Sequence, residues 1–326
     1  MASGPILHRY GEVGIGLGPA MAAGAPLPED KLSPEALEGL GAFKVRNSSS
    51  YVEAKRRRPY PSASWSGNDQ LAALDPPMPM DAAGSPLAAA PPKFRLSGTI
   101  AVGTIIVHTS GSSFEIPRSE QAMILADVQN GLSFLAAESP AKDITFVHDT
   151  KVIDISTPAV GTKGSFEDAE APWRDQALSR MNYSPGARGV AEYVADLRRR
   201  FRTELAFCAF FVEYPLYHFA YAYPAASYLV MDINVGPWTA ANRDSVYAHE
   251  VCHLFGAPDE YLASRCNCGG SWGVYRVPNV NCEPCAVDPQ ECIMRNNVKQ
   301  LCTATRYHVG YRGLPPYSGG RRPATV

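Results

Sequence analysis

The sequence lacks several features that would place it in common protein classes. It has no cysteine before Cys208 and a formal net charge of only −2 over 326 residues. No stretch is apolar for long enough to span a bilayer, so we expect no membrane insertion. Residues 1–20 lack the basic start and apolar block of a secretory signal peptide. The near-neutral net charge indicates no strong overall attraction to nucleic acid, and we expect no nucleic-acid partner.

The composition instead predicts a globular protein with an atypical N-terminal part. Apolar residues make up 45% of the chain and charged residues 19%. Residues 1–95 are rich in proline and alanine and show little apolar periodicity. We predict that this part is a disordered tail, with a propeptide or export segment as the alternative. In that alternative, the basic run at residues 55–58 would be a processing site.

Beyond residue 95 the pattern predicts alternating strands and helices. Apolar, β-branched runs indicate strands and 3.6-residue periodicity indicates helices. Expected strands cover residues 99–109, 144–155, 206–212, 218–223 and 227–233. Expected helices cover residues 119–137, 187–205 and 242–255, with a loop over 156–184. The fold class is therefore α+β, and prolines on either side of 218–223 favour an edge position for that strand.

The strongest chemical signal lies in the last expected helix. His249, Glu250 and His253 form the pattern His-Glu-x-x-His. Residues four apart share one helix face, so both imidazoles can bind one metal ion, and zinc is the usual ion for this motif. Glu250 is then placed to act as the general base toward a water molecule at that ion.

The residues that follow extend the motif. Gly256 can adopt a left-handed conformation that ends the helix, and Pro258 discourages its resumption. The turn can then return Asp259 as a third ligand, which leaves a fourth position open, as in catalytic zinc sites. Glu260 is the alternative ligand, but the Gly-x-x-Asp spacing favours Asp259.

The extended segment His-Glu-x-x-His-x-x-Gly-x-x-Asp resembles the metzincin metalloproteases, in particular the snapalysin-like branch with aspartate as third ligand. The resemblance implies a zinc-dependent endopeptidase that acts on protein or peptide substrates. It also implies a twisted mixed sheet in an upper subdomain at residues 96–256, and a Cys-rich lower subdomain at 257–326. A methionine turn beneath the metal is typical of the family, and Met294 is the candidate.

The resemblance further implies a substrate-binding edge strand. Its candidate residues are Phe219, Ala220, Tyr221, Ala222 and Tyr223. One departure concerns the tyrosine that some members carry two residues after the methionine, because Asn296 stands there. Tyr261 or Tyr307 is the substitute candidate for stabilising the oxyanion.

The cysteines form a second cluster whose chemistry the sequence leaves open. Four of them, Cys266, Cys268, Cys282 and Cys285, have spacings that suit a structural zinc site. The six cysteines after the motif are even in number, which favours disulfides, with Cys292 and Cys302 as further partners. The absence of early cysteines excludes a thiolate latch on zinc from the N-terminal part. Cys208 and Cys252 are expected to be buried thiols.

Two other functions compete with the peptidase. The same site would serve a zinc hydrolase of a non-peptide amide, and zinc would also stabilise a non-catalytic binding protein. Disulfides would imply an oxidising destination, reached by a route that needs no cleavable signal, whereas a structural zinc site would suit the cytoplasm.

Overall fold

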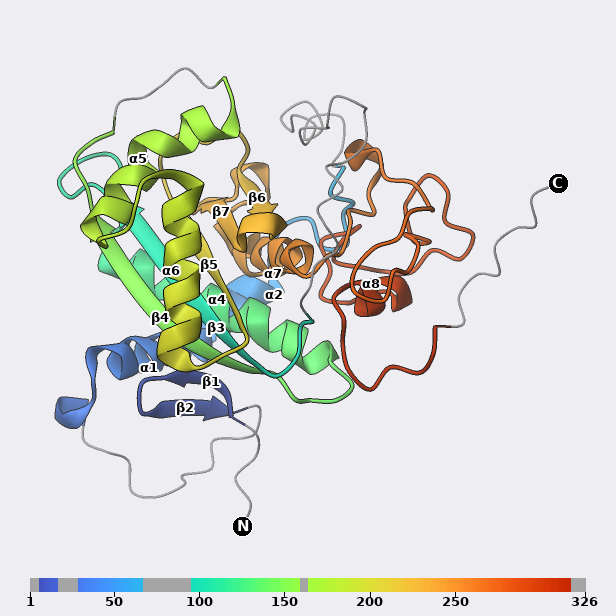
Figure 1. Cartoon of the computed structure of the whole chain (residues 1–326), viewed down its shortest axis with the longest axis horizontal. Coiled ribbons are helices and arrows are strands. Elements are labelled where there is room, and N and C mark those ends of the chain that lie inside the picture. The colour runs from blue at the N-terminus through green and yellow to red at the C-terminus, as the bar shows by residue number, and fades with distance from the viewer. Residues whose placement is uncertain (1–5, 17–28, 67–94, 159–163, 318–326) are drawn as a thin grey trace, which may run out of the picture.

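The computed structural model describes residues 6–16, 29–66, 95–158 and 164–317, and its centre is a seven-stranded mixed sheet (Figure 1). The strands are β1 (Ile6–Tyr10), β2 (Val13–Gly16), β3 (Thr99–His108), β4 (Thr145–Asp154), β5 (Leu205–Val212), β6 (Ala220–Tyr223) and β7 (Tyr228–Asp232). Their order across the sheet is β2-β1-β4-β3-β5-β7-β6. The strands β1, β4, β3, β5 and β7 are parallel, and the two outermost strands, β2 and β6, are antiparallel to their neighbours.

The central strand β3 shows why the sheet forms. All its residues except Thr99 are buried, and it pairs in parallel with β4 on one side and β5 on the other. A parallel strand covered on both faces needs a continuous apolar run rather than alternation, as the residues from Ile100 to Val107 provide. The strands expected over 99–109, 144–155, 206–212 and 227–233 are confirmed.

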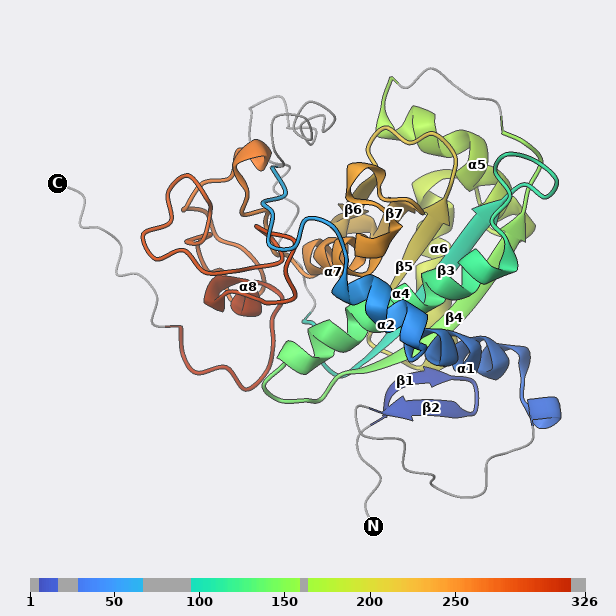
Figure 2. The same ribbon diagram turned by 180° about the vertical axis from the view of Figure 1, so that it is seen from behind.

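Helices cover both faces of this sheet. Helices α4 (Arg118–Glu138) and α7 (Arg243–Leu254) pack with Ile100 and Val102 of β3 in one core. Helices α5 (Phe166–Arg180) and α6 (Gly186–Phe201) pack on the opposite face with Ala101 and Ile105. Figures 1 and 2 show the two layers from opposite sides, with α6 in front of the sheet in Figure 1 and α4 in front in Figure 2.

The expectation of a disordered tail over residues 1–95 was wrong for two segments. Strand β1 pairs with β4 and extends the sheet, and helices α1 (Pro34–Arg46) and α2 (Ser49–Arg56) pack beside α4 (Figure 2). Local signals support these helices, since the Ser33 hydroxyl accepts from Ala36 N–H and the Ser48 hydroxyl from Tyr51 N–H at their N-termini. The proline-rich run at 76–92 lies outside the described residues.

The basic run at residues 55–58 also has a structural role. Lys55 lies in helix α2 and its side-chain exposure is 12%. Its ammonium contacts Asp127 of α4 at 2.6 Å and Asp244 of α7 at 2.9 Å. Arg58 donates to the Ser245 hydroxyl at 2.6 Å. This run therefore attaches the N-terminal part to the helix that carries the His-Glu-x-x-His motif.

The loop expected over residues 156–184 was also wrong, because α5 occupies most of it. Helix α5 contains Pro172, and its buried positions include the fully buried pair Glu170 and Arg174, 3.0 Å apart. A proline and buried charges conceal the helical pattern in the sequence. The apolar positions Ala169 and Trp173 nevertheless recur at helical spacing and face the core.

The chain after α7 forms a loop-rich region beside the sheet (Figure 1). Its only helices among the described residues are the single turn Leu262–Ser264 and α8 (Thr303–His308). Disulfides Cys266–Cys282 and Cys268–Cys285 cross-link its loops. No helix in the described part of the chain is long and apolar enough to cross a membrane.

Candidate metal centre

Helix α7 presents the two motif histidines from a rigid, buried position. All its residues except His253 are buried, and α4 and β6 are among the elements packed against it. The helix ends at Leu254, and Gly256 has a φ of +95°, a left-handed conformation suited to glycine. Gly256 N–H donates to His253 O at 2.9 Å and Ala257 N–H to Cys252 O at 3.1 Å, which turns the chain back toward the helix.

This turn brings Asp259 to the two histidines. His249 Nε2 lies 3.1 Å from His253 Nε2, and Asp259 Oδ1 lies 3.2 Å and 3.1 Å from these two nitrogens. Three ligands of one tetrahedral zinc ion, each about 2.0–2.1 Å from the metal, would be roughly 3.3 Å apart. The three atoms therefore have nearly the spacing that a shared zinc ion requires.

The other ring nitrogens fix the orientation of both imidazoles. His249 Nδ1 donates to Ile293 O at 2.9 Å, and His253 Nδ1 donates to Ala257 O at 2.7 Å. A carbonyl partner at Nδ1 places the proton there and leaves the Nε2 lone pair for a metal. Asp259 Oδ1 is buried within 3.2 Å of both Nε2 atoms, and with the ring protons on Nδ1 it has no donor there, so a cation would be its partner.

The charges at this site couple Asp259 to the two histidines. Burial alone would raise the pKa of Asp259, but His253 and His249 outweigh it and hold that pKa well below its usual range. Burial lowers the pKa of His253, yet the Asp259 carboxylate overrides it and raises that pKa to about 9. The aspartate is thus ionised, and a metal ion would compete with a proton for His253.

Glu250 lies beside the triad formed by His249, His253 and Asp259, and it is on the same helix as the two histidines. It is 6% exposed, and burial raises its pKa above the ordinary carboxyl value, while His253 and His249 lower it in part. His218, just before β6, also interacts with this carboxyl. His218 could not be recognised as a site residue from the sequence, because a single histidine in such a position is usually structural.

The segment around Met294 contacts the candidate site at His249 and at the residue that follows Asp259. Met294 is fully buried, and Ile293 O accepts from the ring of His249. Met294 O accepts from the N–H of Glu260 at 2.9 Å, and Glu260 directly follows the candidate ligand Asp259. The backbone at 293–294 therefore contacts one histidine and the neighbour of the aspartate.

Glu260 points away from the triad and serves as a buried anchor. Its side chain is fully buried, and the Asn281 amide, the Thr305 hydroxyl and the Cys302 thiol donate to it at 2.6, 2.7 and 3.1 Å. Its backbone O accepts from Glu283 N–H at 2.7 Å. Of the two candidates for third ligand, the structure places only Asp259 at the histidines.

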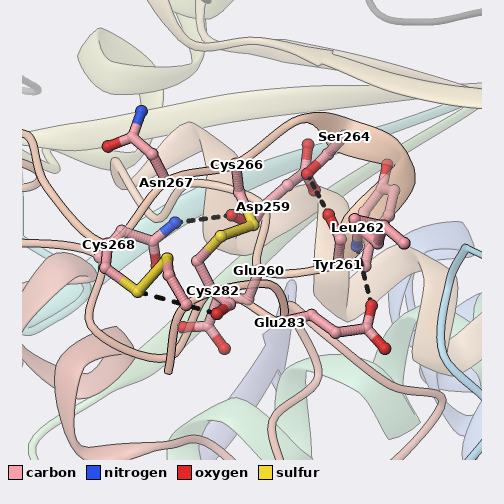
Figure 3. Close-up of a disulfide and its surroundings, with 12 residues drawn as sticks. Asp259, Glu260, Tyr261, Leu262, Ser264, Cys266, Asn267, Cys268, Cys282 and Glu283 are labelled. Atoms are coloured by element: carbon pink, nitrogen blue, oxygen red, sulfur yellow. Dashed lines mark hydrogen bonds between the residues drawn. A yellow bond between two sulfur atoms is a disulfide. The ribbon is translucent and has the colours of Figure 1, made fainter. Parts of the chain in front are cut away.

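The four clustered cysteines form two disulfides in this structure. Cys266 pairs with Cys282 and Cys268 with Cys285, and the first bond lies beside Asp259 and Glu260 (Figure 3). The sulfur atoms of Cys268, Cys282 and Cys285 lie within 4.8 Å of one another, so the same residues would also suit a metal after reduction. The remaining cysteines are free and buried, as expected for Cys208 and Cys252.

The two tyrosine candidates differ in position. The Tyr261 ring centroid lies 6.3 Å from that of His249. Tyr307 is 6% exposed and its hydroxyl donates to Pro315 O at 2.6 Å, so this phenol has a partner outside the triad. Of the two, Tyr261 is the one that the structure places near the histidines.

Trp65 is a site residue that the sequence did not reveal, because it lies within the presumed tail. Its ring centroid is 5.4 Å from that of His249 and 4.6 Å from that of Trp238, both edge-to-face. Its indole N–H donates to Ile293 O, the carbonyl that also accepts from His249. Ser64 and Asn296 form an antiparallel bridge beside it.

The expected substrate strand is shorter than predicted. Strand β6 covers Ala220–Tyr223 and pairs with β7, whereas Phe219 precedes it and its O accepts from Asp232 N–H at 2.7 Å. In the described part of the sheet, β6 has no strand on its other side. Tyr221 is buried and contributes to the core under α5, so its side chain faces the protein.

Comparisons with known proteins find only distant likenesses. No family model and no curated protein matches the sequence. A solved zinc-dependent peptidase from Methanocorpusculum labreanum is similar over 64% of this chain and 99% of its own, with a TM-score of 0.33 and 11% identity. Metalloproteinase-II from Bacteroides fragilis is similar over 73% of this chain and 64% of its own, with a TM-score of 0.30 and 14% identity. Likenesses this weak carry no argument, so the inference about function rests on the donor geometry.

Proposed function

We propose that the protein is a zinc-dependent endopeptidase of metzincin type. The observation that carries the proposal is the triangle of His249 Nε2, His253 Nε2 and Asp259 Oδ1, with sides of 3.1–3.2 Å and Glu250 beside it. Two imidazoles and one carboxylate fit a catalytic zinc site, because a tetrahedral ion keeps its fourth position for water or substrate.

The chain's own residues have separable roles in this proposal. Zinc, when bound, supplies Lewis-acid chemistry that polarises the scissile carbonyl and acidifies water. Glu250 takes the proton of the attacking water and passes it to the leaving amine. Its raised pKa suits a group that both accepts and returns a proton. Ile293 O and Ala257 O hold the two imidazoles in register.

An extended peptide is the substrate that best fits the surroundings. The outer edge of β6 offers backbone N–H and C=O groups with no strand partner among the described residues. A peptide can add to such an edge as a further strand, which would bring its backbone alongside the end of α7. Contacts between α7 and β6 support this placement.

The test compares the wild type with Glu250→Gln on a broad peptide library. We expect Glu250→Gln to keep bound zinc and to lose cleavage by at least about 100-fold, because general-base catalysis contributes about 10²–10⁴-fold. A zinc-bound wild type that leaves the library intact would contradict the peptidase. If it cleaves a non-peptide amide instead, the same site serves the alternative hydrolase. If function persists in Glu250→Gln, the zinc has a structural role.

A further inference from the structure

Two buried cysteines lie together at the side chain of Glu260, the residue after Asp259, without forming a bond. Cys292 is fully buried, Cys302 is 2% exposed, and both are free. Their sulfur atoms and a carboxylate oxygen of Glu260 lie within 4.8 Å of one another. Each sulfur is also 3.3 Å from the hydroxyl oxygen of Thr305. The two thiols thus share one small polar pocket in the core.

The backbone holds this pair in place. Ile293 N–H donates to Gln300 O at 2.8 Å, so the chain returns toward Cys292 before it reaches Cys302. Cys302 caps α8, where its sulfur accepts from Thr305 N–H at 3.3 Å. The backbone turn after Cys292 and the N-terminal cap of α8 therefore hold the two cysteines close together.

We propose that Cys292 and Cys302 form a third disulfide, which joins the Met294 turn to the start of α8. A low-molecular-weight disulfide, such as oxidised glutathione, supplies the oxidising equivalents. One cysteine thiolate attacks it and releases one small thiol, and the other cysteine then displaces the second. Two protein thiols become one S–S bond, one small disulfide becomes two small thiols, and the two cysteine protons remain on these products.

The burial of both sulfurs sets when the bond forms. An oxidant cannot reach them in the folded core, so the exchange takes place during folding, under the conditions that join Cys266 to Cys282 and Cys268 to Cys285. Burial raises the pKa of Cys292 in the closed core, where its thiolate would be a minor species. Oxidation before the core has folded takes place while the thiolate is still accessible and more abundant.

The same three groups also form a possible ligand set for a metal, but their hydrogen bonds favour the disulfide. Glu260 already accepts from Asn281 and Thr305 at 2.6 and 2.7 Å, so its carboxylate is satisfied without a cation. Loss of the Cys302 S–H donor on oxidation leaves these two bonds in place. Formation of the disulfide therefore removes only the weak hydrogen bond from the Cys302 thiol to Glu260.

The test maps all cysteines in the full-length chain produced in an oxidising compartment. Denaturation in an alkylating reagent without reductant, followed by peptide mass spectrometry, counts free thiols, and elemental analysis of the native protein counts metal. The structure has four free cysteines, and the proposal leaves two, Cys208 and Cys252. The disulfides Cys266–Cys282 and Cys268–Cys285 serve as the internal reference for oxidation.

Two variants sharpen the result. Cys302→Ser keeps a hydroxyl near Glu260 and Thr305, and we expect it to expose one additional free thiol, at Cys292. Cys208→Ser should lose one free thiol and keep the linked peptide pair of Cys292 and Cys302. Four alkylated cysteines in wild-type protein whose other two disulfides are complete would overturn the proposal, whether or not a metal is found at the two thiols.

Discussion

The indole N–H of Trp65 and the imidazole Nδ1 of His249 donate to the same carbonyl oxygen, that of Ile293. The two rings lie edge-to-face with centroids 5.4 Å apart. A residue from the N-terminal part thus completes the surroundings of a proposed zinc ligand. The N-terminal part consequently contributes to the surroundings of the candidate metal centre.

We expect Trp65→Ala to destabilise the protein by about 3–5 kcal/mol, because it removes a large side chain that is only 7% exposed. Urea unfolding of the zinc-free protein measures this. Trp272→Ala is the matched control, because that indole is more exposed and its N–H donates to Gly269 O at the long distance of 3.3 Å. A loss of under 1 kcal/mol for Trp65→Ala would contradict the packing described.

Removal of residues 1–66 distinguishes an integral segment from a removable propeptide. The structure predicts that the shortened chain fails to fold, since β1, α1, α2 and the Lys55 ion pairs with Asp127 and Asp244 are lost. Circular dichroism and solubility report the outcome. A folded shortened chain with higher peptidase activity would instead support the propeptide.

Replacement of Glu260 by Gln should weaken zinc binding about 10- to 100-fold, which is the range for residues that orient the metal ligands without binding the metal themselves. The amide nitrogen would replace one of the two carboxylate oxygens and would face a donor, either the Asn281 amide or the Thr305 hydroxyl, and the strain would reach the adjacent Asp259. Competition with a fluorescent chelator measures the zinc affinity. Glu291→Gln, a surface control, should bind zinc as the wild type does.

Buried His308 predicts a pH dependence of stability. Burial lowers its pKa to about 4, compared with 6.5 in an unfolded chain, although hydrogen bonds to Pro278 and Val277 raise it slightly. Above pH 6.5 the His308 side chain is neutral in both the folded and the unfolded protein. Between pH 6.5 and about 4 only the unfolded state binds the proton, so stability falls by about 1.4 kcal/mol per pH unit from this residue.

The comparison of wild type with His308→Asn isolates that contribution. We expect the difference in unfolding free energy between the two proteins to shrink by about 2 kcal/mol from pH 7 to pH 5, because only the wild type carries this histidine. Urea unfolding at the two pH values gives both numbers. An unchanged difference would show that His308 is not held neutral in the folded protein.

The sequence predicted the central strands and the His249–His253 pair because local patterns determine them. A continuous apolar run specified β3, and the four-residue spacing of the histidines specified one helix face. The placement of Asp259 followed from the glycine and proline of the turn. These features depend on residues that are close together in the sequence, so the local sequence pattern predicts them directly.

Long-range contacts account for what the sequence did not reveal. Trp65 reaches the site by pairing with residues near 296, more than two hundred positions later. Helix α5 hides its pattern because its buried Glu170 accepts hydrogen bonds from residues more than fifty positions later, the hydroxyls of Tyr223 and Tyr228. Polar residues that are buried only because a distant partner satisfies them cannot be recognised from local hydropathy.

The most direct test of the account is the metal content of the full-length protein, measured by elemental analysis alongside His253→Ala and Asp259→Ala. Zinc should be present in the wild type at the triad and should be lost or strongly reduced in both variants, while the disulfide-bonded cysteines hold none. Folded wild-type protein that never met a chelator and contains no zinc would contradict the metal centre. Zinc retained undiminished in both variants would contradict the ligands assigned to it.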